Sequence, residues 1–205
     1  KACFKGQGSE LEIHHAYLKE LQTTDYELPY PNIVALDKKS AILHYRAKRV
    51  SKDHNLLLID AGYRFQGYCS DISRTYIRQQ SHPTFVTLLE QMEIAQQEIC
   101  DKVRPGVHLS ELKELFLEKL LSILMESEIV KTKSLDELKL SEIPDLFMPH
   151  GLGHMLGIQV HDVGGSQINA SGELPKPIAG KNINTQRTRR PLRQDEVVTI
   201  EPGLY

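Results

Sequence analysis

The heptapeptide MPHGLGH is the feature that most constrains how this chain folds, because it places two histidines among glycines. His150 and His154 have the spacing of one helical face, but Gly151 and Gly153 disfavour a helix there. Glycines in an extended segment instead let the backbone approach another group closely. A third histidine, His161, follows in the same glycine-containing region. We therefore expect an extended segment that presents histidines to a site.

Two aspartates stand where strands are expected. Asp60 ends an apolar run, and Asp71 lies within an alternating, β-branched run over residues 68–77. If residues 57–61 and 68–75 form a hairpin that turns near 65–66, Asp60 lies directly opposite Asp71, with Cβ atoms roughly 5 Å apart. Carboxylates so close repel unless one is protonated or a cation lies between them. A pair of metal ions about 3.5–4 Å apart suits this geometry.

A glutamate completes the set of metal-ligating residue types. Glu201 follows an expected strand over residues 196–200 and precedes Pro-Gly. A buried glutamate at such a point must be paired or bind a metal. Taken singly, each aspartate could be a turn residue, each histidine a core residue and Glu201 a solvated one. Together they are typical of a hydrolytic metal site, although no HExxH motif of the zinc proteases is present.

Two further groups have an open interpretation. His44 ends an expected alternating strand over residues 40–45, where a lone histidine is more often structural. Arg187 and Arg190 belong to a cluster of four arginines in residues 164–193, which we expect to form a long exposed loop. The cluster is either a solvated face or a clamp for a carboxylate, since guanidinium groups bind carboxylates bidentately.

Composition excludes several classes of protein. The 205 residues carry a formal net charge of −2, which gives no reason to expect a nucleic-acid or anionic-membrane partner. No apolar run is long enough to span a membrane. The 3 cysteines are far apart, so we expect neither a disulfide framework nor a thiolate zinc site. Reduced thiols indicate the cytoplasm.

The order of elements favours an α+β layer fold in one domain, residues 1–205, over an alternating βαβ array. Ser9 and Glu12 form a capping box that opens a first helix with Leu11, Ala16, Leu18 and Leu21 on its apolar side. The other expected elements are strands at 32–36, 40–45, 56–59 and 68–77, helices at 83–103 and 109–129, a charged surface segment at 131–142 and a strand at 196–200.

Seven motifs occur in an order that resembles a known family. They are NIVAL, ILHY, IDAG, SDISRT, PHGLGH, VHDVG and TIEPGLY, and they run over nearly the whole chain. In this combination the chain is similar to the catalytic domain of bacterial Xaa-Pro dipeptidases (prolidases). That family belongs to the pita-bread metallopeptidases, with aminopeptidase P and methionine aminopeptidase. The resemblance implies a pita-bread fold, in which helices cover an antiparallel sheet.

The resemblance also implies a site with two divalent metal ions, usually Mn²⁺. The ligands would fall on Asp60, Asp71, His154 and Glu201, with Asp71 bridging the metals. His44 and His161 fall where the family handles substrate and protons, and His150 matches a histidine beside the ligands. Arg187, by its spacing to the last ligand, would hold the carboxylate of a dipeptide, and Arg190 is the second candidate.

The family's pattern extends beyond this chain. A fifth ligand, a glutamate on the next strand, would follow residue 205, and prolidases carry an N-terminal domain before the first helix seen here. Both ends therefore look cut, and we expect the activity and a homodimer to belong to the parent protein. The expected activity is hydrolysis of Xaa-Pro dipeptides. The alternatives are an aminopeptidase P that acts on longer peptides, and a non-catalytic pita-bread binding module.

Overall fold

The computed structural model describes residues 8–52, 54–78, 81–131, 134–139, 141–169, 171–174 and 187–205. The chain divides into two compact units. The first comprises Lys1–Val86 with Gly157–Val160, and the second comprises Thr87–Leu156 with His161–Tyr205. The short segment 157–160 joins the first unit through Cys69, whose N–H donates to the carbonyl of Gly157 at 2.7 Å.

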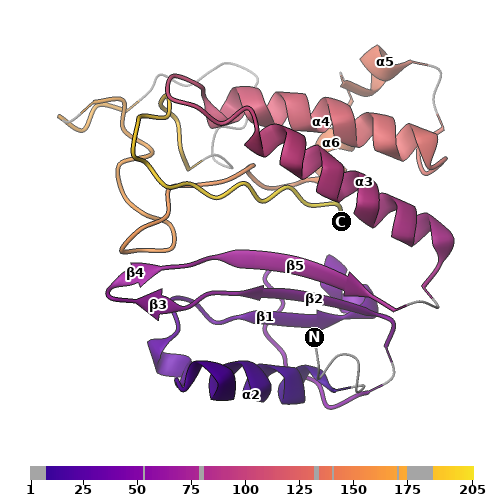
Figure 1. The fold of residues 1–205 in the computed structure, drawn as a ribbon. Helices are drawn as coiled ribbons and strands as arrows, with labels where there is room; N and C mark the ends of the chain where they lie inside the picture. The colour runs from indigo at the N-terminus through magenta and orange to yellow at the C-terminus, as the bar shows by residue number, and fades with distance from the viewer. Residues whose placement is uncertain are drawn as a thin grey trace. The chain divides into compact units, whose positions relative to one another are not determined.

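A three-stranded antiparallel sheet forms the centre of the first unit. Its order is β1 (Ile33–Leu36), β2 (Leu56–Ala61) and β5 (Ile72–Ile77). The helix α2 (Glu10–Leu21) lies against one face of this sheet (Figure 1). The expected strands at 32–36 and 56–59 are thus confirmed. The opposite face of the sheet is not covered by α2.

Alternation along β2 assigns side chains to the two faces. Leu57 and Ile59 pack with Ile13 of α2, whereas Leu58 packs on the other side with Tyr45. Successive residues of a strand point to opposite faces. Asp60 therefore shares the face of Leu58, away from α2, and a polar site can form there without disturbing the apolar layer under the helix.

The first helix begins as the sequence predicts. The Ser9 hydroxyl accepts from the N–H of Glu12 at 3.3 Å, and the Glu12 carboxylate accepts from the N–H of Ser9 at 2.8 Å. This is the predicted capping box. The buried face differs from the expected one, because the buried residues are Glu10, Ile13 and His14 rather than Leu11, Ala16, Leu18 and Leu21. A buried carboxylate and a buried imidazole were not foreseen by an apolar pattern.

The predicted hairpin forms, but its register was wrong. The turn is made by Gln66 and Gly67, both in the left-handed region with φ 49° and φ 89°. This is the backbone of a two-residue hairpin turn, and it connects β3 (Arg64–Phe65) to β4 (Tyr68–Cys69). The turn lies one residue later than expected, so Asp60 pairs with Ser73 rather than Asp71.

The shift keeps the two aspartates on the same face. Moving a partner by one residue would reverse its face, but moving it by two preserves it. Asp71 stands two residues before Ser73, which makes it a diagonal neighbour of Asp60. The prediction that the two carboxylates share a face survives, although directly opposed carboxylates do not occur.

The strand expected over residues 40–45 is absent. A 3₁₀ helix, η2 (Asp37–Ala41), is followed by a turn in which the N–H of Tyr45 donates to the carbonyl of Ile42 at 3.2 Å. The Asp37 carboxylate accepts from the N–H groups of Asn55 and Leu56, both at 2.9 Å. This side chain caps the start of β2, so residues 37–41 coil beside β2 instead of extending along it.

Helices form the bulk of the second unit. They are α3 (Pro83–Cys100), α4 (Leu109–Glu126), α5 (Leu135–Lys139) and α6 (Ile143–Phe147). The two long helices are confirmed, and each ends three residues before its expected end. Leu88, Ala95 and Ile99 are the buried positions of α3, and Met92 packs against the same core. The short helices α5 and α6 carry too weak a pattern to be predicted.

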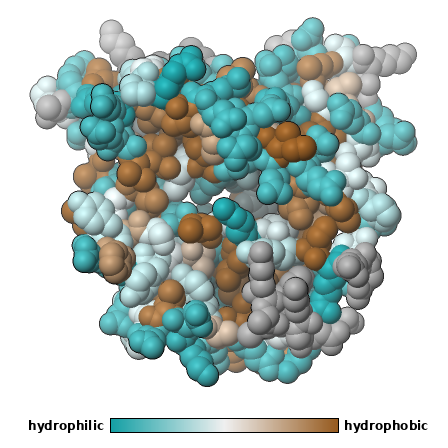
Figure 2. All heavy atoms as spheres, viewed as in Figure 1, coloured by the Kyte–Doolittle hydropathy of each residue, from teal (hydrophilic) through white to brown (hydrophobic). Residues whose placement is uncertain are grey.

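The core of this unit joins the long helices to the histidine-containing segment. Phe116, Leu120 and Leu124 of α4 are fully enclosed, and Met148 and Leu152 belong to the same cluster. Figure 2 shows hydrophilic side chains beside hydrophobic ones over the helices, as expected of helices with one apolar face. Within the described part of the chain, no helix has the length and apolarity needed to cross a bilayer.

Two extended segments run antiparallel beside this core. The N–H of Thr199 donates to the carbonyl of His154 at 2.9 Å, and the N–H of Glu201 donates to that of Leu152 at 2.8 Å. Residues 196–200, where a strand was expected, are extended and paired. They form an isolated bridge, Met155 to Val198, instead of a regular strand. The expected exposed loop at 164–193 is partly wrong, since Arg190 is buried; its residues 170 and 175–186 lie outside the described ones.

Candidate functional site

In the first unit, one tyrosine hydroxyl contacts both aspartates. The Tyr30 oxygen lies 2.6 Å from Oδ1 of Asp60 and 2.8 Å from Oδ1 of Asp71. Tyr30 stands between Pro29 and Pro31, whose rings fix φ on both sides of it, and the backbone bends here. A phenol has one proton, so it donates to one carboxylate at a time. At any moment the Tyr30 oxygen therefore faces the other carboxylate without a hydrogen between them, unless that carboxylate is protonated or a cation is bound there.

Burial and the neighbouring negative charge both disfavour ionisation of Asp60. Burial is the largest influence and raises the pKa of Asp60 above its usual 3.8; the negative charge of Asp71 adds to this, while the Tyr30 hydrogen bond opposes it. Burial, followed by the charge of Asp60, raises the pKa of the Tyr30 phenol, which stays protonated. The carboxylate pair is therefore costly to keep ionised, and a bound cation would relieve that cost.

His44 lies in the same unit on the turn that replaces the expected strand. Its backbone is left-handed, with φ 55°, and its side chain is exposed. The positive charge of Arg46, in the same segment, is among the minor influences that lower the pKa of Asp60. Non-glycine residues in the left-handed region are uncommon and occur often at functional sites.

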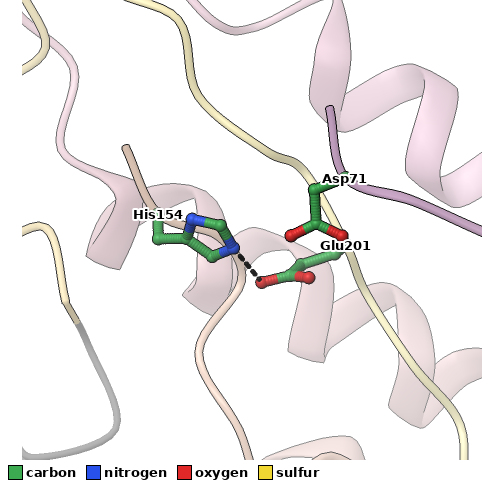
Figure 3. A group of neighbouring side chains, drawn as sticks. All are labelled: Asp71, His154 and Glu201. Atoms are coloured by element: carbon green, nitrogen blue, oxygen red, sulfur yellow. Dashed lines mark ion pairs between the residues drawn. The ribbon is translucent and has the colours of Figure 1, made fainter. Parts of the chain in front are cut away.

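In the second unit, His154 faces Glu201. Nε2 of His154 lies 3.4 Å from Oε1 of Glu201 (Figure 3). Nδ1 lies 2.9 Å from the carbonyl oxygen of Met155, and a carbonyl only accepts, so Nδ1 carries the proton. A neutral imidazole then directs the lone pair of Nε2 toward a carboxylate. This is the arrangement of a ring oriented to bind a metal, or of an imidazolium paired with a carboxylate.

The antiparallel pairing explains why these two residues meet. A Cβ on Gly153 would lie 1.9 Å from the carbonyl oxygen of Thr199, so only glycine permits this approach. The N–H of His154 also donates to the Thr199 hydroxyl at 3.0 Å. Because Thr199 is held against His154, Glu201 is placed diagonally across from the imidazole. The glycine that the sequence pattern singled out thus serves backbone pairing.

Of the other two predicted histidines, His161 contacts this pair. The ring of His161 contacts that of His154 edge to face, with centroids 4.4 Å apart, and its side chain is exposed. His150 has Nδ1 at 2.8 Å from the carbonyl of Gly151, and its ring meets that of Tyr205 edge to face at 5.4 Å. All three histidines therefore belong to the second unit, as Glu201 does.

The two candidate arginines have different environments. Nη1 of Arg190 lies 3.0 Å from Oε2 of Glu196, and Nη2 contacts the other oxygen, which makes a bidentate pair. Its Nε donates to the carbonyl of Gly164 at 2.9 Å. The Arg190 hydrogen bond is the largest influence on the pKa of Glu196 and lowers it. Arg187, in contrast, is exposed.

Each unit thus presents donors that suit a divalent cation. The first offers two carboxylates that share one hydroxyl proton, and the second offers an imidazole nitrogen turned toward a carboxylate. Carboxylate and imidazole donors are the usual ligands of Mn²⁺ and Zn²⁺. In each unit two electron-rich atoms now face each other. A metal ion bound between them would replace this unfavourable contact by two favourable ones. The residues present therefore fit a metal-binding role.

Sequence reasoning missed three residues that hold these groups. Tyr30, Thr199 and Glu10 contact the candidate residues or the segment that carries them. A tyrosine framed by two prolines was the available signal for Tyr30, since each proline ring fixes the φ angle of the backbone beside it. Neither Thr199 nor Glu10 carries a local signal, because their contacts are made with distant parts of the sequence.

Known proteins are similar in sequence to this chain over its whole length. An Xaa-Pro dipeptidase 2 of Idiomarina loihiensis is 40% identical over 207 residues, which cover 100% of this chain and 46% of that protein. An Xaa-Pro dipeptidase of Shewanella woodyi is 42% identical, with the same coverage. The chain thus spans about half the length of the curated relatives it matches.

Solved structures agree with these relatives. The aminopeptidase PepP of Pseudomonas aeruginosa is 29% identical with a TM-score of 0.79, covering 100% of this chain and 44% of that one. The proline aminopeptidase P II of Yersinia pestis is 28% identical with a TM-score of 0.76, covering 97% and 42%. The fold is the α+β pita-bread fold of aminopeptidase P. Residues 2–205 match the sequence model of metallopeptidase family M24. The chain belongs to metallopeptidase family M24.

Proposed function

We propose that this protein is a metal-dependent Xaa-Pro dipeptidase, which hydrolyses the bond before proline in dipeptides. The observation that carries the proposal is the contact of His154 with Glu201, in which a proton on Nδ1 leaves Nε2 facing a carboxylate. Membership of the metallopeptidase family supports it. So does the identity of 40% and 42% with proteins named Xaa-Pro dipeptidases.

The proposed metal ligands are those that the family resemblance implies. Asp60, Asp71, His154 and Glu201 would hold two divalent ions, which we propose to be Mn²⁺. We propose one catalytic domain over residues 1–205. When bound, such ions lower the pKa of a water molecule and polarise the carbonyl that it attacks.

The remaining residues would handle the substrate. His44 and His161, both exposed, would hydrogen-bond the peptide carbonyl and carry protons, and His150 would steady the segment beside His154. Arg187 would bind the terminal carboxylate of the dipeptide, since its guanidinium is exposed. Arg190 is the second candidate, and its bidentate pair with Glu196 gives it a clear role in holding the segment that carries Arg187.

A second candidate function is that of an aminopeptidase P. It is favoured by the structural likeness to aminopeptidases from Pseudomonas aeruginosa and Yersinia pestis. An aminopeptidase P differs in accepting longer peptides with proline at the second position. Comparing an Xaa-Pro dipeptide with an Xaa-Pro-Xaa tripeptide separates the two, because a carboxylate-binding arginine next to proline favours the dipeptide only.

The test is a paired measurement on the purified protein in its whole natural length. After loading with Mn²⁺ and removal of excess metal, elemental mass spectrometry gives the metal content, and hydrolysis of the two substrates is followed in the same sample. Two ions per chain with faster dipeptide hydrolysis supports the proposal. Faster tripeptide hydrolysis supports aminopeptidase P. Neither metal nor hydrolysis would indicate a non-catalytic binding module and overturn both.

The setting of the protein is part of the proposal. Cys69 and Cys100 are free thiols in the structure, and reduced cysteines are typical of the cytoplasm. We propose a cytoplasmic enzyme that acts on small peptides, with neither a nucleic-acid nor a membrane partner. Its parent would be a homodimer, which sedimentation velocity of the purified protein would test.

A further inference from the structure

Glu10 is a carboxylate with no exposed surface, in the first turn of α2. Its oxygen Oε1 accepts from the N–H of Leu36 at 3.1 Å and contacts Nζ of Lys39 at 2.5 Å. Its oxygen Oε2 accepts from the hydroxyl of Tyr45 at 2.9 Å and from the N–H of Arg49 at 2.7 Å. Four donors thus converge on one side chain, which uses the full acceptor capacity of an ionised carboxylate.

The four donors share one property, since all belong to residues 36–49. That segment leaves β1, passes through η2 and carries His44. Two of the donors precede His44 and two follow it, so the carboxylate fixes the segment on both sides of the histidine. Tyr45, the next residue, is buried and is held by its hydroxyl to Glu10.

The backbone of His44 needs such support. Its φ of 55° lies in the left-handed region, which non-glycine residues adopt at an energetic cost. A strained conformation persists only where its surroundings determine it. The turn that contains His44 is closed by one hydrogen bond, from the N–H of Tyr45 to the carbonyl of Ile42. The tether from Tyr45 to Glu10 is a second restraint directly beside it.

We propose that Glu10 is a positioning residue, whose carboxylate holds residues 36–49 so that His44 keeps one position. The proposal rests on the proposed function, in which His44 contacts the substrate. Glu10 does not itself touch the substrate. Its role is to keep the imidazole in one place before the substrate arrives, which preserves the alignment that catalysis needs.

The ionised form of Glu10 is what this role requires. Burial alone would raise its pKa, but the Lys39 contact, followed by the hydrogen bonds from Arg49, Tyr45 and Leu36, holds the pKa below the usual 4.5. A glutamine of the same shape offers one acceptor oxygen and turns an NH₂ group toward two of the donors. Glu10→Gln therefore removes the clamp while changing the volume of the side chain very little.

The matched control is Glu12→Gln on the same helix. Glu12 receives the same chemical change, but its carboxylate bonds Ser9 and Lys52 rather than residues 36–49. Glutamine also serves in a capping box. NMR of the metal-free protein measures the ³J(HN–Hα) coupling of His44, which reports its φ. We expect the coupling to change in Glu10→Gln and to stay as in wild type in Glu12→Gln.

A kinetic cycle tests the functional part. We expect Glu10→Gln to lower kcat/KM for an Xaa-Pro dipeptide by roughly 10²-fold, as small misplacements of a reacting group do. In a His44→Ala background the same change should have no further effect, because a residue that acts through His44 cannot act without it. Metal content should stay as in wild type. An equal loss in both backgrounds would overturn the proposal.

The outcomes remain separable if a variant folds poorly or the enzyme is inactive. Tyr45→Phe removes a single tether and replaces Glu10→Gln if that variant does not fold; the expected change in the His44 coupling has the same direction and a smaller size. If wild type does not cleave Xaa-Pro substrates, the proposed function fails, and the coupling still decides whether Glu10 positions His44. An unchanged coupling in both variants would overturn the proposal.

Discussion

The hydroxyl of Tyr30 lies within 2.8 Å of carboxylate oxygens of both Asp60 and Asp71, so a single proton serves two acceptors. We therefore expect the Tyr30 hydroxyl to stabilise the metal-free protein. Tyr30→Phe removes the hydroxyl and leaves two nearby carboxylates facing each other. We expect a loss of about 1–3 kcal/mol in the free energy of unfolding in EDTA, measured by urea denaturation. The loss should shrink with Mn²⁺, and an equal loss in both conditions would contradict this account.

Asp71→Asn should separate stability from metal binding. It removes one charge from a carboxylate pair in which each charge disfavours the other. We therefore expect the metal-free variant to melt at a higher temperature than metal-free wild type. The gain in melting temperature that Mn²⁺ gives wild type should vanish, together with hydrolysis. Differential scanning fluorimetry with and without Mn²⁺ measures both effects. A variant that keeps two ions and normal turnover would refute the ligand assignment.

Gly153→Ala should break the pairing that brings His154 to Glu201. Its Cβ would lie 1.9 Å from a backbone oxygen of Thr199, and backbone cannot move aside as a flexible side chain can. Overpacking of this kind costs about 1–3 kcal/mol, so we expect a clear loss of stability. Hydrogen exchange of the Thr199 and Glu201 amides should also accelerate. Protection equal to that of wild type would show that the clash is relieved elsewhere.

The pKa of Glu10 gives a pH dependence with a definite sign. Its pKa is lowered on folding from the usual 4.5. A lowered carboxyl pKa stabilises the fold above the unfolded value, and the contribution disappears as pH falls through the folded pKa. The difference in unfolding free energy between wild type and Glu10→Gln should therefore be constant near neutrality and decrease below pH 4.5. A difference that grows on acidification would contradict an ionised Glu10.

Replacing Arg190 by alanine should lower stability, whereas replacing Arg187 should impair substrate binding. Arg190→Ala leaves the partly buried carboxylate of Glu196 without its bidentate partner, so we expect a loss of stability smaller than the about 3–5 kcal/mol of a fully buried pair. Arg187→Ala removes an exposed side chain, so stability should be kept while KM for a dipeptide rises. Thermal melts and steady-state kinetics on both variants decide the roles. A rise in KM in Arg190→Ala at unchanged stability would assign the substrate role to Arg190 instead.

Local patterns predicted those parts of the fold that local forces determine. The capping box of Ser9 and Glu12, the long helices and the apolar strand before Asp60 all depend on neighbouring residues. The hairpin register depended on where the turn lies, and Gln66 is a weak turn signal compared with asparagine or aspartate. An error of one residue in the turn moved the partner of Asp60 from Asp71 to Ser73.

Long-range contacts explain what the sequence did not predict. Residues 40–45 have an alternating pattern, but the bonds that Asp37 makes to the start of β2 and that Glu10 makes to Tyr45 hold this region in a 3₁₀ helix and a turn. The contact of Tyr30 with two aspartates joins residues 30 and 41 positions apart. No local propensity encodes such a contact, so only a structure reveals it.

The antiparallel pairing of His154 with Thr199 has an evolutionary consequence. Forty-five positions of chain separate the two residues, yet their hydrogen bonds fix the distance from His154 to Glu201. The exposed residues 171–174 lie in the chain between them. A change of length there leaves the pairing in place, since doubling a loop adds only about 0.6 kcal/mol of closure entropy. If the proposed function holds, such changes would alter which peptides are accepted while the imidazole and the carboxylate keep their spacing.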